Sequence, residues 1–112
     1  MVLGQFQERF SPEGEADEFL RRLVLGVLDH REELDRLIEQ YSENWRLNRI
    51  DVIDRNILRM ALFELLYCQD IPPKVTINEA IDLGKRYGSE DSGSFINGIL
   101  DRIQNEVVRK PI

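Results

Sequence analysis

The segment from residue 50 to residue 66 limits the possible folds more than any other part of the chain. Its apolar residues recur at helical spacing but cover much more than one face of a helix, namely Ile53, Ile57, Leu58, Ala61, Leu62, Leu65 and Leu66. A helix that is apolar around most of its circumference is stable only when other elements surround it. The segment therefore predicts a central helix. Pro72 and Pro73 end it, because consecutive prolines cannot continue a helix.

Amphipathic patterns lie on both sides of this central segment, with apolar residues three and four positions apart. The two patterns before it comprise Phe19, Leu20, Leu23, Val24, Val27 and Leu28, and then Leu34, Leu37, Ile38 and Tyr41. The two after it comprise Ile77, Ala80, Ile81 and Gly84, and then Ile96, Ile99, Leu100, Ile103 and Val107. No segment has a convincing strand pattern, so the sequence predicts an all-α, compact helical bundle with short connections.

Local signals suggest where the last two helices begin and end. Thr76 followed by Glu79 has the pattern of a capping box, which predicts a helix start at Thr76. Gly88 fits the residue just after the end of that helix. The last helix is expected to start near Ser89, with two acidic residues in its first turn that complement the positive end of the helix dipole.

Length, composition and charge predict one small soluble domain over residues 1–112. With 112 residues, of which 42% are apolar, the chain suits a single core. We expect a cytoplasmic protein, since the apolar runs are too short to span a bilayer and the first residues lack a basic leader. The net charge of −6 argues against a general nucleic-acid binder. Residues 1–45 hold 11 acidic and 5 basic side chains and residues 46–112 hold 10 of each, so only the second part can present a basic patch.

The chemically reactive residues form no catalytic or metal-binding set. His30 is the only histidine and lies at a helix joint, where we expect a surface or capping role. Cys68 is the only cysteine, and its apolar neighbours favour a buried, inert thiol. No glycine-rich phosphate loop is present, and the serines at 92 and 94 have no histidine nearby in the sequence. We therefore expect neither an enzyme nor a cofactor or metal.

Five stretches of the second part, in order, carry a family resemblance: residues 57–66 (ILRMALFELL), 70–72 (DIP), 74–81 (KVTINEAI), 87–92 (YGSEDS) and 95–101 (FINGILD). Together they closely resemble the NusB family of bacterial transcription antitermination factors, and the likeness extends more weakly back to Phe19. The resemblance implies one helical domain made of two small helical halves. Residues 1–45 would be the remnant of an incomplete N-terminal half, and residues 46–112 the C-terminal half.

The resemblance also implies a function. Members of this family pair with the small ribosomal-subunit protein NusE, and the pair recognises the boxA element of ribosomal RNA leader transcripts. They then join the elongating RNA polymerase complex to suppress termination, which also serves ribosome biogenesis. On this basis Asp91, Ser94 and Phe95 are expected to face RNA. Asp54 and Arg55, with the exposed side of the central helix, are expected to face NusE.

Residues 87–100 fit a contact role on physical grounds as well. Gly93 and Gly98 each cost a helix about 1 kcal/mol relative to alanine, which makes sense where another backbone or an RNA strand approaches closely. Phe95 lies about 100° around the helix from Ile96, so its ring can either flank the core or stack on an RNA base. Phosphate contacts can be added by three basic residues that can equally be simply solvated, Lys85, Arg86 and Arg102.

The beginning of the chain departs from the family pattern. The family begins with an arginine-rich segment and a first helix, whereas the first 20 residues here contain Arg9 as their only arginine. Fewer phosphate contacts would weaken RNA binding steeply. A missing first helix would uncover an apolar groove, to be covered by Val2, Leu3, Phe6 and Phe10 or by a second copy of the chain in a homodimer. A naturally short form and an artificial truncation are both open alternatives.

Two other functions compete with RNA-dependent antitermination. One is a helical module that binds a protein partner and touches no RNA. The other is the NusB-like appendage of RNA cytosine methyltransferases, although the sequence shows no catalytic domain and no nucleophilic cysteine motif. Replacing Phe95 by alanine separates RNA binding from simple packing.

Overall fold

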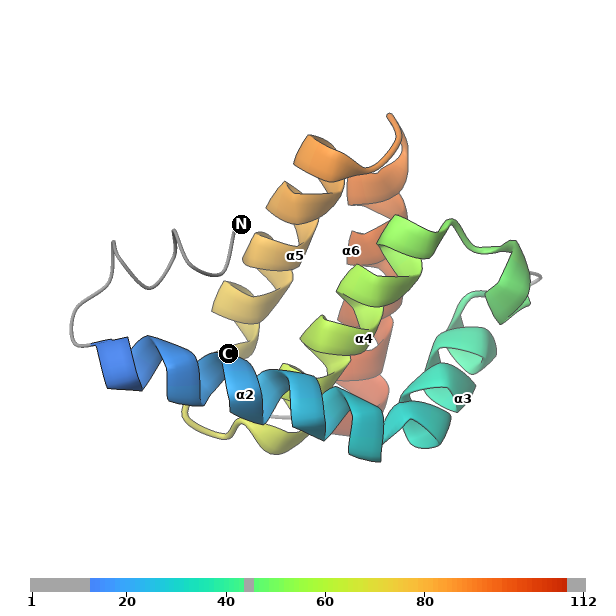
Figure 1. The fold of residues 1–112 in the computed structure, drawn as a ribbon. Coiled ribbons are helices and arrows are strands. Elements are labelled where there is room, and N and C mark those ends of the chain that lie inside the picture. Colours follow the sequence, from blue (N-terminus) through green and yellow to red (C-terminus); the bar gives the residue numbers. More distant parts are fainter. Residues whose placement is uncertain (1–12, 44–45, 109–112) are drawn as a thin grey trace.

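The computed structural model describes residues 13–43 and 46–108, and all the regular structure in these ranges is helical (Figure 1). The α-helices are α2 (Glu13–Asp29), α3 (Arg31–Tyr41), α4 (Val52–Tyr67), α5 (Pro73–Tyr87) and α6 (Ser92–Ile103). A short 3-10 helix, η1 (Leu47–Arg49), precedes α4, and a π-helical turn, η2 (Gln104–Val108), follows α6. No strand occurs in the described ranges, so the all-α prediction is confirmed.

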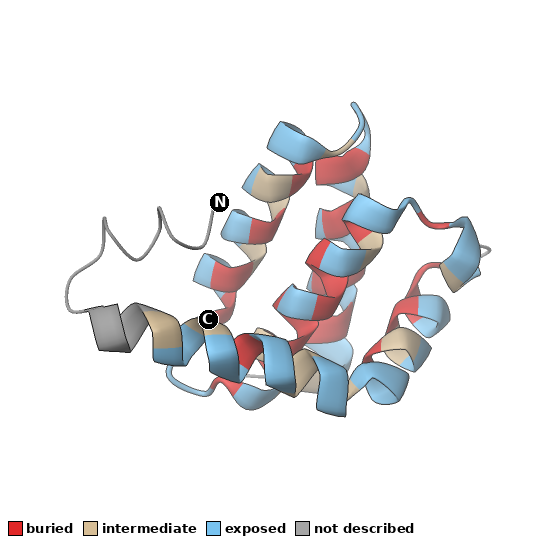
Figure 2. Ribbon diagram, in the orientation of Figure 1, coloured by how far each residue is buried: buried red, intermediate tan, exposed pale blue. Residues whose placement is uncertain are grey.

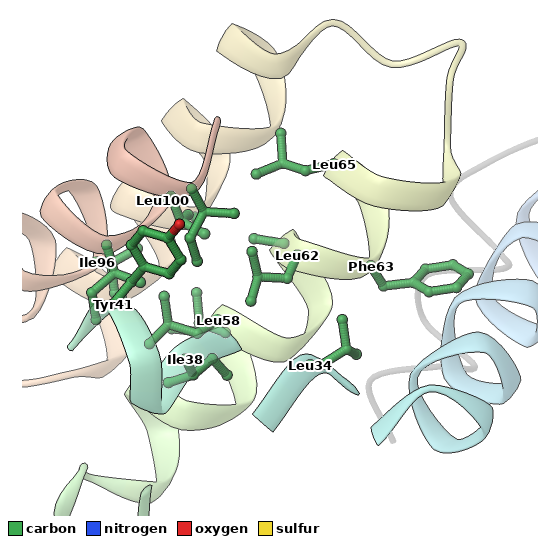
Figure 3. Packing of buried hydrophobic residues seen from close by; sticks show 14 of the residues in the cluster. Leu34, Ile38, Tyr41, Leu58, Leu62, Phe63, Leu65, Ile96 and Leu100 are labelled. Carbon is green, nitrogen blue, oxygen red and sulfur yellow. The ribbon is translucent and has the colours of Figure 1, made fainter. Parts of the chain in front are cut away.

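Helix α4 is the centre of the bundle, as its wide apolar pattern predicts. It packs against α2, α3, α5 and α6, and its buried positions face all of these neighbours (Figure 2). Leu58, Leu62 and Leu65 have no exposed surface. Figure 3 shows their side chains among Ile38 of α3 and Leu100 of α6. Cys68, the residue that follows α4, is buried, as expected.

Helix α5 begins at Pro73, three residues before the expected start at Thr76. Proline is favoured in the first helical turn, because its fixed φ suits the helix and its missing amide proton is not needed there. Thr76 is therefore inside the helix and buried, and its hydroxyl donates a hydrogen bond of 3.0 Å to Glu64 on α4. The capping-box prediction was wrong, and Thr76 instead joins two helices.

Helix α6, by contrast, begins later than predicted, at Ser92, so that Glu90 and Asp91 precede it. The Ser92 hydroxyl accepts a hydrogen bond of 2.8 Å from the Ser89 amide and thereby closes the α5–α6 turn. Gly88 ends α5 as predicted, but its φ of −95° is not left-handed. A Cβ atom at Gly88 would lie 2.3 Å from the Ser92 hydroxyl, so the turn itself requires glycine.

The buried residues of α6 and η2 agree with the apolar pattern predicted for the last helix, except at one position. Ile96, Ile99, Leu100 and Ile103 are all buried. Val107 was expected to be in the core, but 40% of it is exposed. The change to π-helical geometry after Ile103 alters the angle between successive side chains, which removes Val107 from the apolar face.

Helix α2 packs against α4 at Gly26, whose missing side chain leaves room for an aromatic ring. The ring of Phe63 on α4 occupies the space beside Gly26, where an added Cβ would lie 2.1 Å from the ring (Figure 3). His30 is half-buried, its ring centroid lies 5.9 Å from that of Phe63, and its Nδ1 lies 2.9 Å from the Gly26 carbonyl oxygen. This contact at the end of α2 agrees with the capping role expected for His30.

Much of the apolar pattern of α2 does not enter the core. Leu23 is buried, whereas Phe19, Val24 and Leu28 are exposed. Together with Met60 of α4, part of this face lines an apolar groove of 450 Å³. The residues proposed to cover such a groove, at positions 2–10, lie outside the described ranges, and the homodimer stays a prediction. In the described ranges no helix is both long and apolar enough to cross a membrane.

A hydrogen bond between α3 and α4 leads to a pH-dependent prediction. The Tyr67 hydroxyl donates to Glu33, and this bond, followed by burial and the charge of Glu33, raises the pKa of Tyr67 above its ordinary value of 10.0. Because the folded-state pKa is raised, the protonated phenol stabilises the fold below pH 10.0. That contribution is lost as the pH rises through the folded-state pKa.

We expect Glu33→Gln to lower the pKa of Tyr67 in a spectrophotometric tyrosinate titration. The Tyr67→Phe variant identifies which transition belongs to Tyr67. An unchanged titration in Glu33→Gln would exclude Glu33 as the cause of the raised pKa.

Candidate nucleic-acid interface

Phe95 lies on α6 between two hollows of the surface and lines both of them. Its side chain is half-buried and packs against the edge of the core. Both roles left open by the sequence, flanking the core and offering a surface for stacking, are therefore compatible with the position of Phe95. Phe95 thus packs against the core and also lines the two hollows.

The first hollow, called the acidic pocket below, has a volume of 260 Å³. Its lining comes from η1 and the start of α4 and from the α5–α6 turn and the start of α6: Arg49, Ile50, Asp51, Asp54, Ser89, Asp91 and Phe95. Asp51 and Asp91 are the N-cap residues of α4 and α6, yet neither side chain makes a capping hydrogen bond. Both carboxylates are therefore free to meet a ligand.

Asp54 differs most from its expected setting. The resemblance assigned it to a partner surface together with the exposed side of α4, but Asp54 is only 6% exposed. It occupies the first turn of α4, where its charge complements the helix dipole. Its Oδ1 atom is buried without a hydrogen-bond partner in the described structure. The neighbouring Arg55 is half-buried and donates a hydrogen bond of 3.3 Å to the Leu47 carbonyl of η1.

The second hollow, called the α3–α6 pocket below, has a volume of 250 Å³. It is lined by Tyr41, Ser42, Glu43, Ser94, Phe95, Gly98, Ile99 and Arg102. The Arg102 guanidinium donates a hydrogen bond of 3.1 Å to the Tyr41 carbonyl, and its Cζ lies 5.3 Å from the centre of the Tyr41 ring. Arg102 is thus anchored to the end of α3, which limits its freedom to follow a phosphate.

The two glycines of α6 have different environments. A Cβ at Gly93 would lie 3.1 Å from Cγ of Lys85, so Gly93 lets α5 and α6 pack closely. At Gly98 an added Cβ would meet nothing within 4 Å. No close packing among residues 13–43 and 46–108 explains Gly98, which lines the α3–α6 pocket.

We expect Gly98→Ala to raise the free energy of unfolding by about 1 kcal/mol, because alanine is the better helix former and finds open space there. Gly93→Ala is the matched comparison, since the stem of Lys85 must move to admit the methyl group. It should give a smaller gain or a loss. Urea unfolding of both variants measures the difference. Equal effects would contradict the conclusion that Gly93 is closely packed and Gly98 is not.

The structure brings five of the eight predicted site residues to these two pockets: Asp54, Asp91, Ser94, Phe95 and Arg102. Lys85 and Arg86 line neither pocket; they are exposed on the last turn of α5, with the guanidinium of Arg86 6.0 Å from the Tyr87 ring. The sequence reasoning missed Arg49, Ile50 and Asp51. The only sequence feature that could have pointed to them is the aspartate directly before the central helix. Such an aspartate predicts a helix start rather than a ligand contact.

The described ranges contain no cluster of three or more histidine, cysteine, aspartate or glutamate residues that could hold a metal ion. The two pockets are open hollows of moderate size with an aromatic residue between them. An all-helical bundle with such a surface has the form of a small binding protein that presents a contact face to a macromolecule.

Comparisons with known proteins identify the family. The NusB family profile matches residues 3–105. The transcription antitermination protein NusB of Myxococcus xanthus is 57% identical over 89 residues, which are 80% of this chain and 64% of that protein. The NusB of Desulfatibacillum aliphaticivorans is 50% identical over 102 residues, 91% of this chain and 71% of that protein. The chain belongs to the NusB family, as its sequence resemblance predicted.

A solved structure of Thermotoga maritima NusB has the same fold. It superposes with a TM-score of 0.84 at 50% sequence identity, over 90% of this chain and 70% of that one. The chain thus spans about two thirds of the length of these relatives.

Proposed function

We propose that this protein acts in transcription antitermination, as a non-enzymatic RNA-binding subunit. In this proposal it pairs with ribosomal protein NusE, and the pair binds boxA RNA and joins the elongating RNA polymerase complex in the cytoplasm. Family membership supports the proposal, because the curated relatives are named transcription antitermination proteins. The division into halves at residues 45 and 46 stays a prediction.

The observation that carries the RNA-binding part is the setting of Phe95. Its half-buried ring borders two open pockets, and Gly98 offers an unobstructed backbone one helical turn away. A partly buried aromatic ring is a suitable platform for a single-stranded base, and such stacking contributes about 1–3 kcal/mol per base. Lys85 and Arg86, exposed at the end of α5, add two cations that can contact phosphates.

The test combines partner binding with RNA binding. The protein and NusE are mixed at micromolar concentrations and separated by size exclusion, and the complex is then titrated with boxA RNA in a mobility-shift assay. A scrambled RNA of the same composition is the control. We expect a one-to-one complex that prefers boxA over the scrambled RNA. If no complex with NusE forms, the proposal is wrong.

The alternative of a protein-interaction module without RNA binding is favoured by one observation. Three of the four charged residues around the acidic pocket are aspartates, which repel phosphates. The same assay separates the two functions, since a module of this kind would form the protein complex but would not shift boxA RNA.

A further inference from the structure

The charged side chains of the acidic pocket have no partners within the described structure. Within the described ranges the side chains of Arg49, Asp51, Asp54 and Asp91 form no ion pair and no hydrogen bond, and the Ser94 hydroxyl donates to the backbone carbonyl of Asp91 rather than to its carboxylate. Aspartate is among the preferred N-cap residues because its side chain bonds the first free amides of a helix. Asp51 and Asp91 occupy N-cap positions without making that bond. Helix capping therefore does not account for these carboxylates.

Asp54 provides the second, independent observation. It is more than nine-tenths buried and lines the pocket, and its Oδ1 atom lacks a hydrogen-bond donor. Burying a carboxylate oxygen without a donor is costly, and native proteins rarely retain such a group unless it is used. A ligand that brings donors to this carboxylate would remove that cost.

The charge of the pocket indicates the kind of ligand. Three carboxylates face one guanidinium, that of Arg49, and the N-termini of α4 and α6 each add roughly half a positive charge. The pocket remains negative, so it suits a cation and disfavours a nucleotide, whose phosphate would lie close to the carboxylates. A bare metal ion is disfavoured because the described carboxylates form no metal-binding cluster.

The apolar residues of the lining favour a planar cation over a compact one. Ile50 and Phe95 contribute to the pocket together with the carboxylates. A guanidinium can stack on an aromatic ring and can also donate two parallel hydrogen bonds to one carboxylate. An ammonium group has no flat face and binds a carboxylate as a point charge.

We propose that the acidic pocket binds an arginine side chain of a protein partner, held between the Phe95 ring and the carboxylates of Asp54 and Asp91. The inference deepens the proposed function and rests on it only for the identity of the protein that supplies the arginine. Binding would neutralise the pocket beside Phe95 and so reduce repulsion of an RNA strand at the adjoining α3–α6 pocket. Partner and RNA would then strengthen each other's binding.

The first test uses the isolated protein and needs neither NusE nor RNA. N-acetyl-arginine amide is titrated into isotope-labelled protein and followed by amide chemical shifts, with N-acetyl-citrulline amide as a neutral control of nearly the same shape. We expect saturable shifts at residues 49–54 and 89–95 with the arginine probe alone. Equal shifts with citrulline, shifts confined to other acidic surfaces, or no shifts would overturn the proposal. So would stronger shifts of these residues with guanosine monophosphate.

The second test uses variants that preserve side-chain shape. Asp54→Asn and Asp91→Asn should each weaken binding of the arginine probe about tenfold, the change expected for losing one charge-assisted hydrogen bond. Asp82→Asn, at an exposed position of α5 outside both pockets, should leave it unchanged. Thermal melting confirms that each variant is folded. If Asp91→Asn and a folded Asp54→Asn bind the probe like the parent, the proposal is wrong.

The same variants locate the arginine in the complex with NusE. Asp91→Asn should weaken the complex about tenfold, again the change for one charge-assisted hydrogen bond, and Asp82→Asn should not. Failure of the parent protein to bind NusE would contradict the proposed function, while the arginine titration would still decide the proposal for the pocket. An unchanged complex in the Asp91→Asn variant would overturn the assignment of this arginine to NusE.

Discussion

Replacing Leu62 by alanine is expected to lower the free energy of unfolding by about 2–5 kcal/mol. Leu62 is fully buried at the middle of α4, where Figure 3 shows it among core side chains of neighbouring helices. The substitution removes buried apolar surface and leaves a cavity that surrounding helices fill only in part. Urea unfolding followed by circular dichroism measures the effect. Total stability is typically only about 5–15 kcal/mol, so this single change can unfold a large fraction of the molecules.

Met60 on the same helix provides the matched control. It is 36% exposed, and Met60→Ala keeps a strong helix former in place. We expect Met60→Ala to change stability by less than about 1 kcal/mol, as is usual for changes away from the core. If both variants lose the same stability, α4 is not the centre of the bundle.

The central helix could be predicted from sequence because apolar periodicity directly reflects burial. Leu58 and Leu62 differ by four positions, and Leu65 continues the same face, so their burial follows from helical geometry alone. The burial of the apolar residues of α6 follows from helical spacing in the same way, up to Ile103. The prediction fails at Val107, where the helix geometry changes and the periodicity no longer applies.

The two helix starts were mispredicted because local patterns compete. Thr76 and Glu79 match a capping box, but Pro73 already supplies the φ angle of a first helical turn. The actual partner of the Thr76 hydroxyl is Glu64, twelve residues earlier on another helix. A local pattern contains no information about a neighbour that only the fold brings close.

The apolar pattern of α2 illustrates a related limit. Its spacing correctly predicted a helix, yet Val24 and Leu28 remain exposed. Periodicity shows which face of a helix is apolar, but the covering element depends on the arrangement of the whole bundle. The sequence alone therefore could not decide whether this face enters the core.

The candidate site was only partly predictable for the same reason. Phe95 and Asp91 were found through the family resemblance, and Asp54 was assigned to a separate surface. The fold places all three around one pocket, because the start of α4 lies beside the start of α6. Arg102 looked like a free cation in the sequence, whereas the structure anchors it to the Tyr41 carbonyl. Such anchoring contacts join residues far apart in the chain and leave no periodic signal.

Phe95→Ala is expected to weaken boxA binding by the complex with NusE about 5- to 150-fold, which corresponds to losing roughly 1–3 kcal/mol of base stacking. The variant will also lose some stability, because the ring packs against the core. The binding assay must therefore be carried out well below the melting temperature of the variant. Mobility-shift titration at one fixed salt concentration gives the affinities, since phosphate contacts make RNA binding strongly salt-dependent.

Phe95→Leu separates stacking from packing. Leucine retains apolar contact with the core but has no aromatic face, so we expect it to recover most of the stability lost in Phe95→Ala and little of the RNA affinity. Circular dichroism and thermal melting of both variants confirm that they are folded, and NusE is added at saturating concentration so that only boxA binding is compared. If Phe95→Leu binds boxA as tightly as the parent protein does, Phe95 is a packing residue. The RNA contact would then have to be made by other groups, first among them the open backbone at Gly98 and the exposed cations of α5.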